Sequence, residues 1–180
     1  MKEKKITKEL CLVFLIRGKS DGFIEVLLAP KKTASGGRDF LIGKYNGYGG
    51  GIDDVDEGIP ERALIREVSE ESGGIVLIEE DLEKVALLYF SFENGPTFRC
   101  YTYFAKNWIG EPSESEEMGK PEWFYFRSED DCNLPFDKMM PGDKRILSIL
   151  LSGKIIEEGE VFFNKDGSEL LGLTYKEAKS

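Results

Sequence analysis

One amphipathic helix, placed between two sets of strand-like runs, constrains the fold of this chain more than any other feature. The segment Pro60 to Gly73 (PERALIREVSEESG) carries apolar residues at helical spacing, starts with a proline that the first turn of a helix tolerates, and stops at a glycine. Apolar, β-compatible runs precede it at 11–17 and 23–29 and follow it at 85–92 and 97–105. A short glycine-containing segment joins the members of each pair, so we expect two β-hairpins around the helix.

The C-terminal part repeats this combination of strands and a helix. We expect a short strand at 122–126, a second helix from Pro141 to Gly153, and a third hairpin around Asn164 to Gly167. Strand pairs separated by two helices predict an α+β fold or α/β/α sandwich, a mixed sheet covered by helices. A chain of 180 residues without repeats or linkers is expected to form one domain over residues 1–180.

The composition excludes several classes of function. A formal net charge of −10 opposes binding to a nucleic-acid polymer, because such binding depends on clustered lysine and arginine. An acidic protein can still bind a small phosphorylated molecule when a divalent metal bridges its carboxylates to the phosphates. The chain has no histidine, which excludes histidine-based triads and histidine-ligated zinc. Acid and base chemistry is therefore left to carboxylates, lysine, tyrosine or metal-bound water.

The sequence favours a soluble cytoplasmic protein. No apolar run approaches the ~18 residues that a membrane span requires, and the first ten residues lack the apolar region of a secretory signal, so we expect no membrane partner. Cys11, Cys100 and Cys132 are odd in number and widely spaced, which suits reduced thiols better than a disulfide framework. We expect a monomer or a weak homodimer.

Three glutamates share one face of the first expected helix. Glu67, Glu70 and Glu71 stand at i, i+3 and i+4, which at ~100° per residue places them within one sector. Like charges at this spacing repel one another unless a hard divalent cation offsets them. A solvated acidic face is the simpler alternative. The helix, however, follows a glycine-rich loop at 45–51 whose backbone can approach a phosphate or a metal, and Arg66 can hold an acidic loop residue in place.

This region resembles the Nudix box, G-x5-E-x7-R-E-U-x-E-E-x-G-U, in which U is aliphatic. Residues 66–73 (REVSEESG) match the R-E-U-x-E-E-x-G half fully. The resemblance implies a Nudix fold, with a mixed β-sheet flanked by helices, and a hydrolase of nucleoside diphosphate derivatives. It also implies Mg²⁺, with Mn²⁺ as the alternative ion, bound by Glu67, Glu70 and Glu71 together with the Gly50 carbonyl.

The first half of the box has irregular spacing. Counted from Gly51, Glu57 follows after five residues, but eight residues instead of seven separate it from Arg66. Counted from Gly50, the acidic position is Asp56 and the gap is nine residues. The loop therefore carries an insertion. We expect Arg66 to pair with Glu57, which keeps the first spacing, and Asp56 is the alternative partner.

Further segments resemble the MutT-related 8-oxo-purine nucleoside triphosphate diphosphatases, particularly the animal type. Residues 43–50 (GKYNGYGG) are similar to G-x-W-N-G-F-G-G of that group, whose asparagine contacts the purine, so the resemblance gives this role to Asn46. In the segment ESEEM, it implies an additional metal ligand at Glu117 and a residue of the base pocket at Met118. Of two consecutive purine-reading aspartates, one is retained as Asp143.

A purine requires an apolar slot with a few fixed polar groups. Phe40, Phe90 and Phe92 are candidates for this slot, and ordinary sheet core is an equally good interpretation of aromatic residues that alternate along a strand. Lys31 is a candidate for contacts with the phosphates, and a solvated lysine is the alternative.

Together these features predict Mg²⁺-dependent hydrolysis of a purine nucleoside triphosphate, with an ordinary or oxidised base, to the nucleoside monophosphate and pyrophosphate. Such an activity sanitises the nucleotide pool. A metal-bound water would attack phosphorus in line, and Glu117 or Glu70 would accept its proton. Two alternatives remain open: a pyrophosphatase acting on a dinucleotide, nucleotide sugar or capped RNA end, and a non-catalytic module that binds a nucleotide as a sensor.

Overall fold

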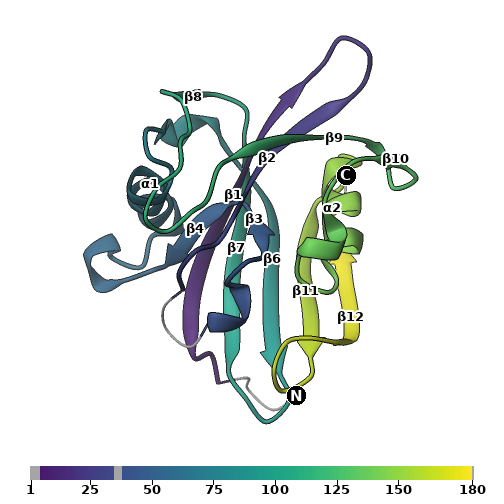
Figure 1. Cartoon of the computed structure of the whole chain (residues 1–180). Coiled ribbons are helices and arrows are strands. Elements are labelled where there is room, and N and C mark those ends of the chain that lie inside the picture. Colours follow the sequence, from purple (N-terminus) through teal and green to yellow (C-terminus); the bar gives the residue numbers. More distant parts are fainter. Residues whose placement is uncertain (1–4, 35–37, 180) are drawn as a thin grey trace.

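The computed structural model describes residues 5–34 and 38–179 (Figure 1). Its strands are β1 (Lys8–Gly18), β2 (Ile24–Pro30), β3 (Tyr45–Asn46), β4 (Tyr48–Gly51), β5 (Val76–Leu77), β6 (Leu82–Phe92), β7 (Thr97–Ala105), β8 (Trp108–Ile109), β9 (Glu122–Ser128), β10 (Asp131–Cys132), β11 (Ile156–Phe163) and β12 (Leu170–Glu177). Its α-helices are α1 (Pro60–Glu71) and α2 (Asp143–Leu151), and its 3₁₀ turns are η1 (Asp39–Leu41), η2 (Asp54–Asp56), η3 (Glu79–Asp81) and η4 (Phe136–Lys138).

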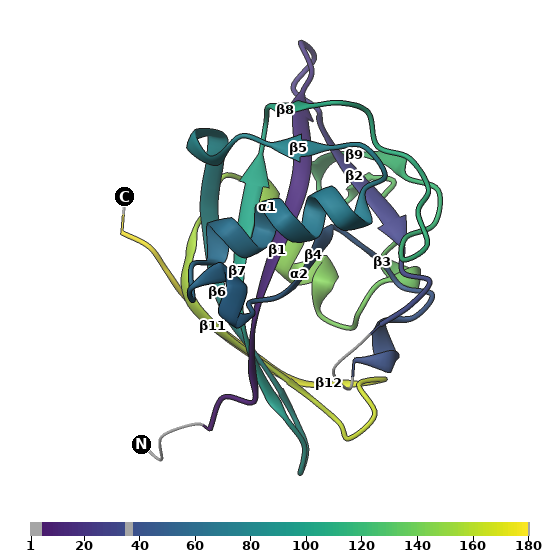
Figure 2. The same ribbon diagram turned by 90° about the vertical axis from the view of Figure 1, so that its left-hand side faces the viewer.

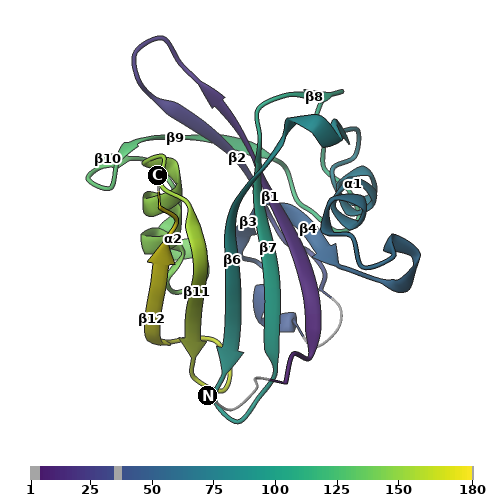
Figure 3. The same cartoon turned by 180° about the vertical axis from the view of Figure 1, so that it is seen from behind.

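The main sheet is mixed and has the strand order β10-β9-β2-β1-β7-β6-β11-β12, whose central part is seen from behind in Figure 3. The pairs β1–β2, β6–β7 and β11–β12 are antiparallel, and they are the three hairpins that the sequence predicts. Two parallel pairings, β1 with β7 and β6 with β11, join these hairpins into one sheet. A separate two-stranded sheet pairs β5 with β8.

The two helices cover opposite faces of this sheet, and Figure 2 shows α1 in front of it and α2 behind. Along β1, Val13 and Leu15 pack in the core on the α1 side, whereas Phe14 and Ile16 pack in the core on the α2 side. This explains why the strand is an almost continuous apolar run, since both of its faces are buried. The predicted α/β/α sandwich is confirmed. Among the residues that the structure describes, no helix is long and apolar enough to cross a membrane.

One edge of β1 changes its partner along its length. Leu10 to Val13 pair with β4, and Leu15 to Gly18 pair with β2. The sheet is therefore forked beside β1, with β4 on one branch and β2 with β3 on the other. The sequence predicts only a glycine-rich loop at 45–51, which is wrong because β3 and β4 form there. A glycine-rich strand such as β4 shows no alternation of side chains that would reveal it.

Candidate active site

Glu71, at the end of α1, is the most buried acidic side chain of the site. The residue is 1% exposed, and its carboxylate accepts a hydrogen bond from the Lys31 ammonium at 2.5 Å and another from the Gly49 backbone N–H at 3.0 Å. Burial raises the pKa of Glu71, while Lys31 and the Gly49 N–H act in the opposite direction. The structure thus brings a predicted metal ligand and a predicted phosphate-binding lysine into one ion pair at the fork of the sheet.

Glu67 lies one turn earlier on α1 and contacts the glycine turn of β4. A Cβ atom on Gly50 would lie 2.2 Å from Oε2 of Glu67, so this close approach of backbone and carboxylate requires glycine. Arg66 donates to Oε1 of Glu67 at 2.9 Å. Burial raises the pKa of Glu67, and the neighbouring Arg66 opposes that shift. Glu67 is therefore oriented between a cation and the backbone that the sequence predicts to supply a carbonyl ligand.

The remaining two predicted ligands are more exposed. The Glu70 side chain is 57% exposed and lies 3.7 Å from Arg66. Glu117 is exposed and borders the same polar cleft as Glu67 and Glu71. The structure therefore gathers three of the four predicted carboxylates around one cleft, and places Glu70 outside the set of residues that line it.

Arg66 pairs with Asp56, so the expected pair with Glu57 is wrong. Its Nε donates to Oδ1 of Asp56 at 2.9 Å and its Nη2 to Oδ2 at 2.6 Å, a two-pronged contact that holds the pKa of Asp56 below its ordinary value. Arg66 also donates to the Gly51 carbonyl at 3.2 Å, which ties the helix to the glycine turn.

Local backbone geometry explains why Glu57 cannot take this place. Asp53 and Asp56 form a reciprocal capping box in η2, which holds Asp56 inward with 3% exposure. Glu57 follows in the left-handed region with a φ of 55°, and its side chain, 67% exposed, pairs instead with Arg62. The inserted residues therefore lie after the acidic position, between Asp56 and the start of α1.

The donor set of this cleft suits a hard divalent cation, because carboxylate and carbonyl oxygens are the ligands that Mg²⁺ takes in proteins. The Lys31 ammonium already places positive charge against Glu71, which shows that a cation is stabilised there. Across residues 5–34 and 38–179, however, no three acidic or cysteine side chains converge as a metal site. Lys31 pairs with Glu71 and Arg66 pairs with Glu67, so a metal on Glu71 would take the place of the Lys31 ammonium.

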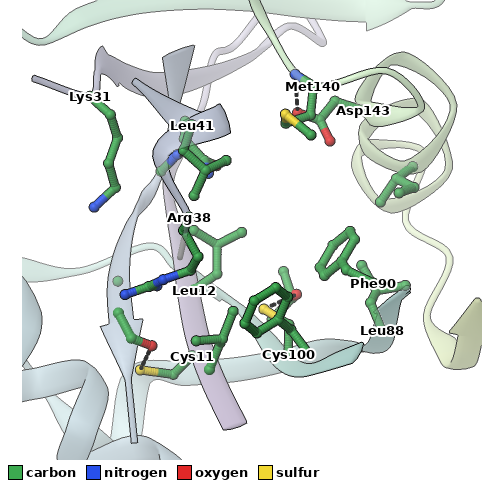
Figure 4. A pocket seen from close by; sticks show the side chains of 18 of the residues that line it. Cys11, Leu12, Lys31, Arg38, Leu41, Leu88, Phe90, Cys100, Met140 and Asp143 are labelled. Carbon is green, nitrogen blue, oxygen red and sulfur yellow. Dashed lines mark hydrogen bonds between the residues drawn. The ribbon is translucent and has the colours of Figure 1, made fainter. Parts of the chain in front are cut away.

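An apolar cavity opens on the α2 side of the sheet, and Figure 4 shows part of its wall. The three predicted slot residues Phe40, Phe90 and Phe92 all line it. The rings of Phe40 and Phe92 are tilted against each other, with centroids 4.7 Å apart, and both residues also belong to the hydrophobic core. The interpretation as sheet core is therefore confirmed, while the purine slot stays a prediction for residues that also face the cavity.

Two predicted base-reading residues, Asn46 and Asp143, also line this cavity. The Asn46 side-chain oxygen accepts a hydrogen bond from the Gly47 N–H at 2.8 Å, which fixes its orientation. The Asp143 carboxylate accepts one from the Met140 N–H at 3.0 Å, and burial raises the pKa of Asp143 to about 7. Near neutral pH the Asp143 carboxyl group is therefore partly ionised and partly protonated. The ionised form only accepts hydrogen bonds, and the protonated form can also donate one.

Met118 does not line the cavity, contrary to expectation. It is 0% exposed and packs in the core on the α1 side, next to the bridge that its backbone makes with Lys31. The face of the sheet on which Met118 packs depends on its bridge with the distant residue Lys31, and the local sequence does not encode that pairing.

Sequence reasoning missed Arg38, which is only 8% exposed and lines both the apolar cavity and the polar cleft. Its only sequence signal is a single basic residue in a glycine-containing loop, which is too weak to single it out. The two spaces are adjacent and share five lining residues: Lys31, Arg38, Leu41, Gly49 and Gly50.

No family model and no curated protein sequence matches this chain. Solved structures do share its fold. A MutT protein from Bacillus halodurans is 23% identical, with 94% of this chain and 97% of that chain covered and a TM-score of 0.68. A MutT NUDIX hydrolase from Burkholderia pseudomallei is 26% identical over 71% of this chain and 88% of that one, with a TM-score of 0.52. A NUDIX hydrolase from Nitrosomonas europaea is 12% identical over 91% and 82%, also with a TM-score of 0.52. The predicted fold class is therefore confirmed.

Proposed function

We propose that this chain is a Mg²⁺-dependent Nudix hydrolase that converts a purine nucleoside triphosphate, with an ordinary or oxidised base, into the nucleoside monophosphate and pyrophosphate. The observation that carries the proposal is the continuity of two unlike spaces. An acidic cleft beside α1 and an aromatic cavity beside α2 share the wall formed by Gly49 and Gly50. A phosphate chain and a purine that belong to one molecule can occupy both.

In this proposal, Glu67, Glu71 and the Gly50 carbonyl would hold Mg²⁺, and Glu117 would add a ligand from the border of the cleft. Glu70, which does not line the cleft, would have to turn toward it to complete the donor set. Bound Mg²⁺, or Mn²⁺ in its place, supplies positive charge against the phosphates and makes a coordinated water more acidic. Arg66 keeps Glu67 and the glycine turn in register through its contacts with both. When the ammonium of Lys31 leaves Glu71, it becomes available for the phosphates.

The bond changes are those of an in-line displacement. The oxygen of water forms a bond to one phosphorus, the bond from that phosphorus to the bridging oxygen breaks, and pyrophosphate leaves. A carboxylate accepts the proton of the attacking water, since the chain has no histidine. Glu117 is favoured over Glu70 as this acceptor because Glu117 borders the cleft.

The base would be held by packing and by few polar contacts. Phe40, Phe90 and Phe92 supply apolar surface for the ring, and Asn46 with Asp143 supplies the hydrogen bonds that select a purine edge. A site with fixed buried polar groups rejects a base that lacks their partners more strongly than an apolar slot does.

A hydrolysis screen in Mg²⁺ tests the proposal, with nucleotide products separated and measured for every substrate and pyrophosphate measured for the triphosphates. The substrates are ordinary and oxidised purine triphosphates, pyrimidine triphosphates, dinucleotides and nucleotide sugars. We expect Mg²⁺-dependent release from purine triphosphates, abolished in the Glu67→Gln variant and retained in Glu57→Gln, a matched change of an exposed acid. Faster cleavage of a dinucleotide or nucleotide sugar would select the alternative hydrolase.

One observation favours a different class of function. The buried Lys31–Glu71 pair neutralises a predicted metal ligand, as expected of a nucleotide-binding module without catalysis. Tight nucleotide binding without turnover in either Mg²⁺ or Mn²⁺ would establish that alternative.

A further inference from the structure

Arg38 stands at the junction of the two spaces that the proposed function assigns to base and phosphates. It immediately precedes η1, the turn that supplies Phe40 and Leu41 to the cavity wall. Arg38 is 8% exposed and lines both the cavity and the cleft. A ligand that spans the two spaces would therefore pass this side chain.

The direction of its side chain narrows that role. In Figure 4 the Arg38 guanidinium points to the side of the cavity where Cys11 and Lys31 lie, whereas Met140 and Asp143 occupy the opposite wall. Burial raises the pKa of the Cys100 thiol, and the positive charge of Arg38 acts in the opposite direction. The charge of Arg38 therefore acts on groups inside the cavity. Asp143 therefore lies at one end of the cavity and the two cations, Lys31 and Arg38, lie at the other.

The chemistry of the junction follows from this separation. A nucleotide with its base near Asp143 and its outer phosphates in the cleft must pass Leu41, Gly49 and Gly50. Besides Arg38, Lys31 is the other cation among the described residues that line both spaces, and its ammonium is 2.5 Å from Glu71. An arginine offers a planar fork of N–H donors that matches two phosphate oxygens, which a lysine does not.

We propose that Arg38 binds the phosphate attached directly to the nucleoside, and so makes that phosphate a requirement for recognition. The proposal rests on the proposed function, because it takes the cavity as the base site and the cleft as the site of the outer phosphates. It predicts that a free nucleoside gains no affinity from Arg38.

The test compares binding with and without the Arg38 side chain, for ligands with and without the phosphate. Calorimetry without metal measures the affinity of 8-oxo-deoxyguanosine monophosphate and of 8-oxo-deoxyguanosine for wild type, Arg38→Met and Arg38→Lys. Loss of a charge-assisted contact should weaken the monophosphate by about 10- to 100-fold in Arg38→Met and leave the nucleoside within about 2-fold. Arg38→Lys, which keeps the charge without the fork, should fall between them.

Lys32→Met is the matched control. Lys32 lies in the same segment, but its ammonium pairs with Glu114 and the Ser115 carbonyl, and it lines neither space. This variant should bind both ligands as wild type does. If Arg38→Met does not fold, the Arg38→Lys variant alone carries the test, with a loss of several-fold expected for the monophosphate only.

Equal loss for nucleoside and monophosphate would overturn the proposal and assign Arg38 a purely structural role. Unchanged binding of the monophosphate in a folded Arg38→Met variant would overturn it as well. Inorganic triphosphate with Mn²⁺ is a probe without a base. If wild type binds it in an Arg38-dependent manner but binds no nucleotide, the base assignment fails and the phosphate site stands; if wild type binds no phosphate-bearing probe, both fail.

Discussion

The polar cleft and the apolar cavity are built in opposite ways, although they share a wall. In the cleft, partners from other parts of the chain hold the acidic groups: Lys31 holds Glu71, and Arg66 joins Glu67 to Asp56. In the cavity, most of the wall is made of side chains of the hydrophobic core, and Asp143 accepts a hydrogen bond from the Met140 N–H. The geometry of the cleft therefore depends on a charge network, and the shape of the cavity depends on packing. A change in the first should affect turnover, and a polar change in the second should affect selectivity.

The largest effect should come from neutralising a carboxylate of the cleft. Glu67→Gln removes an anionic ligand but keeps the size of the side chain, and we expect kcat to fall by at least about 100-fold at saturating Mg²⁺ with the fold retained. Steady-state kinetics and a thermal melt measure the two parts of this prediction. Near-native kcat in a folded Glu67→Gln protein would remove the central residue from the proposed mechanism.

The next effect should come from the network that positions the cleft. Asp56→Asn weakens the pair with Arg66, and we expect kcat to fall about 10-fold and the free energy of unfolding to fall by about 2 kcal/mol. Because Arg66 lowers the pKa of Asp56, this stabilisation is present above the ordinary aspartate pKa and is lost as pH falls through the lowered value. Acid titrations of stability should therefore differ between the variant and wild type.

Glu57→Gln is the control for this experiment, since Glu57 is exposed and its pair with Arg62 lies on the surface. It should change neither kcat nor stability measurably. A silent Asp56→Asn beside an impaired Glu57→Gln would contradict the pairing described above.

A smaller, selective effect is expected in the cavity. The pKa of Asp143 is about 7 in the folded protein, so the preference for purine edges should change as pH passes through this value, and Asp143→Asn should abolish the change. Burial raises this pKa, so the folded state binds more protons than the unfolded state between about pH 4 and pH 7. The ionised Asp143 carboxylate destabilises the folded state, and this effect is absent at about pH 4 and complete above about pH 7.

Asp143→Asn should therefore stabilise the protein relative to wild type more at about pH 8 than at about pH 4. Chemical denaturation at the two pH values measures this difference. A difference independent of pH would show that the carboxyl group is not held away from water.

The smallest effect is expected at Tyr48, next to the glycine turn of the cleft and packed in the core. Tyr48 is 0% exposed, and its hydroxyl has no hydrogen-bond partner among the described residues. Tyr48→Phe removes a buried polar group that lacks a partner, so the free energy of unfolding should rise by about 1 kcal/mol while kcat stays within about 2-fold. A loss of stability instead would indicate that the hydroxyl has a partner in solution, such as an ordered water.

The sequence was most informative where local signals agree. The strand Thr97–Ala105 and the start of α1 at Pro60 lie where turn residues, apolar spacing and the N-terminal proline predict them. β4 was missed because it forms only through pairing with β1, which local patterns do not contain. The side of the sheet on which Met118 packs depends in the same way on a bridge to a distant residue, Lys31.

Within the site, residue spacing predicted which residues line the cleft better than it predicted which residues pair with one another. The helical spacing of Glu67 and Glu71 places both at the cleft, as expected. Counting residues could not decide between Asp56 and Glu57, because the choice depends on a left-handed residue at the end of η2. The capping box between Asp53 and Asp56 was the local signal that could have decided it.

The forked edge of β1 has a consequence for how such a protein can diverge. The chain leaves β2 at Lys31 and returns before β3, and two backbone hydrogen bonds close this excursion at its base, from Lys31 N–H to the Lys44 carbonyl and from Gly43 N–H to the Lys31 carbonyl. A change between these points would leave Lys31 and Asn46 in place, because the base of the excursion is fixed by these bonds. β4 and α1 lie on the other branch, so Glu67 and Glu71 would keep their positions as well. Arg38 and Leu41, which line both spaces, would change with the loop. In the proposed function, ligand preference could therefore change in this loop while the carboxylates of α1 stay where they are.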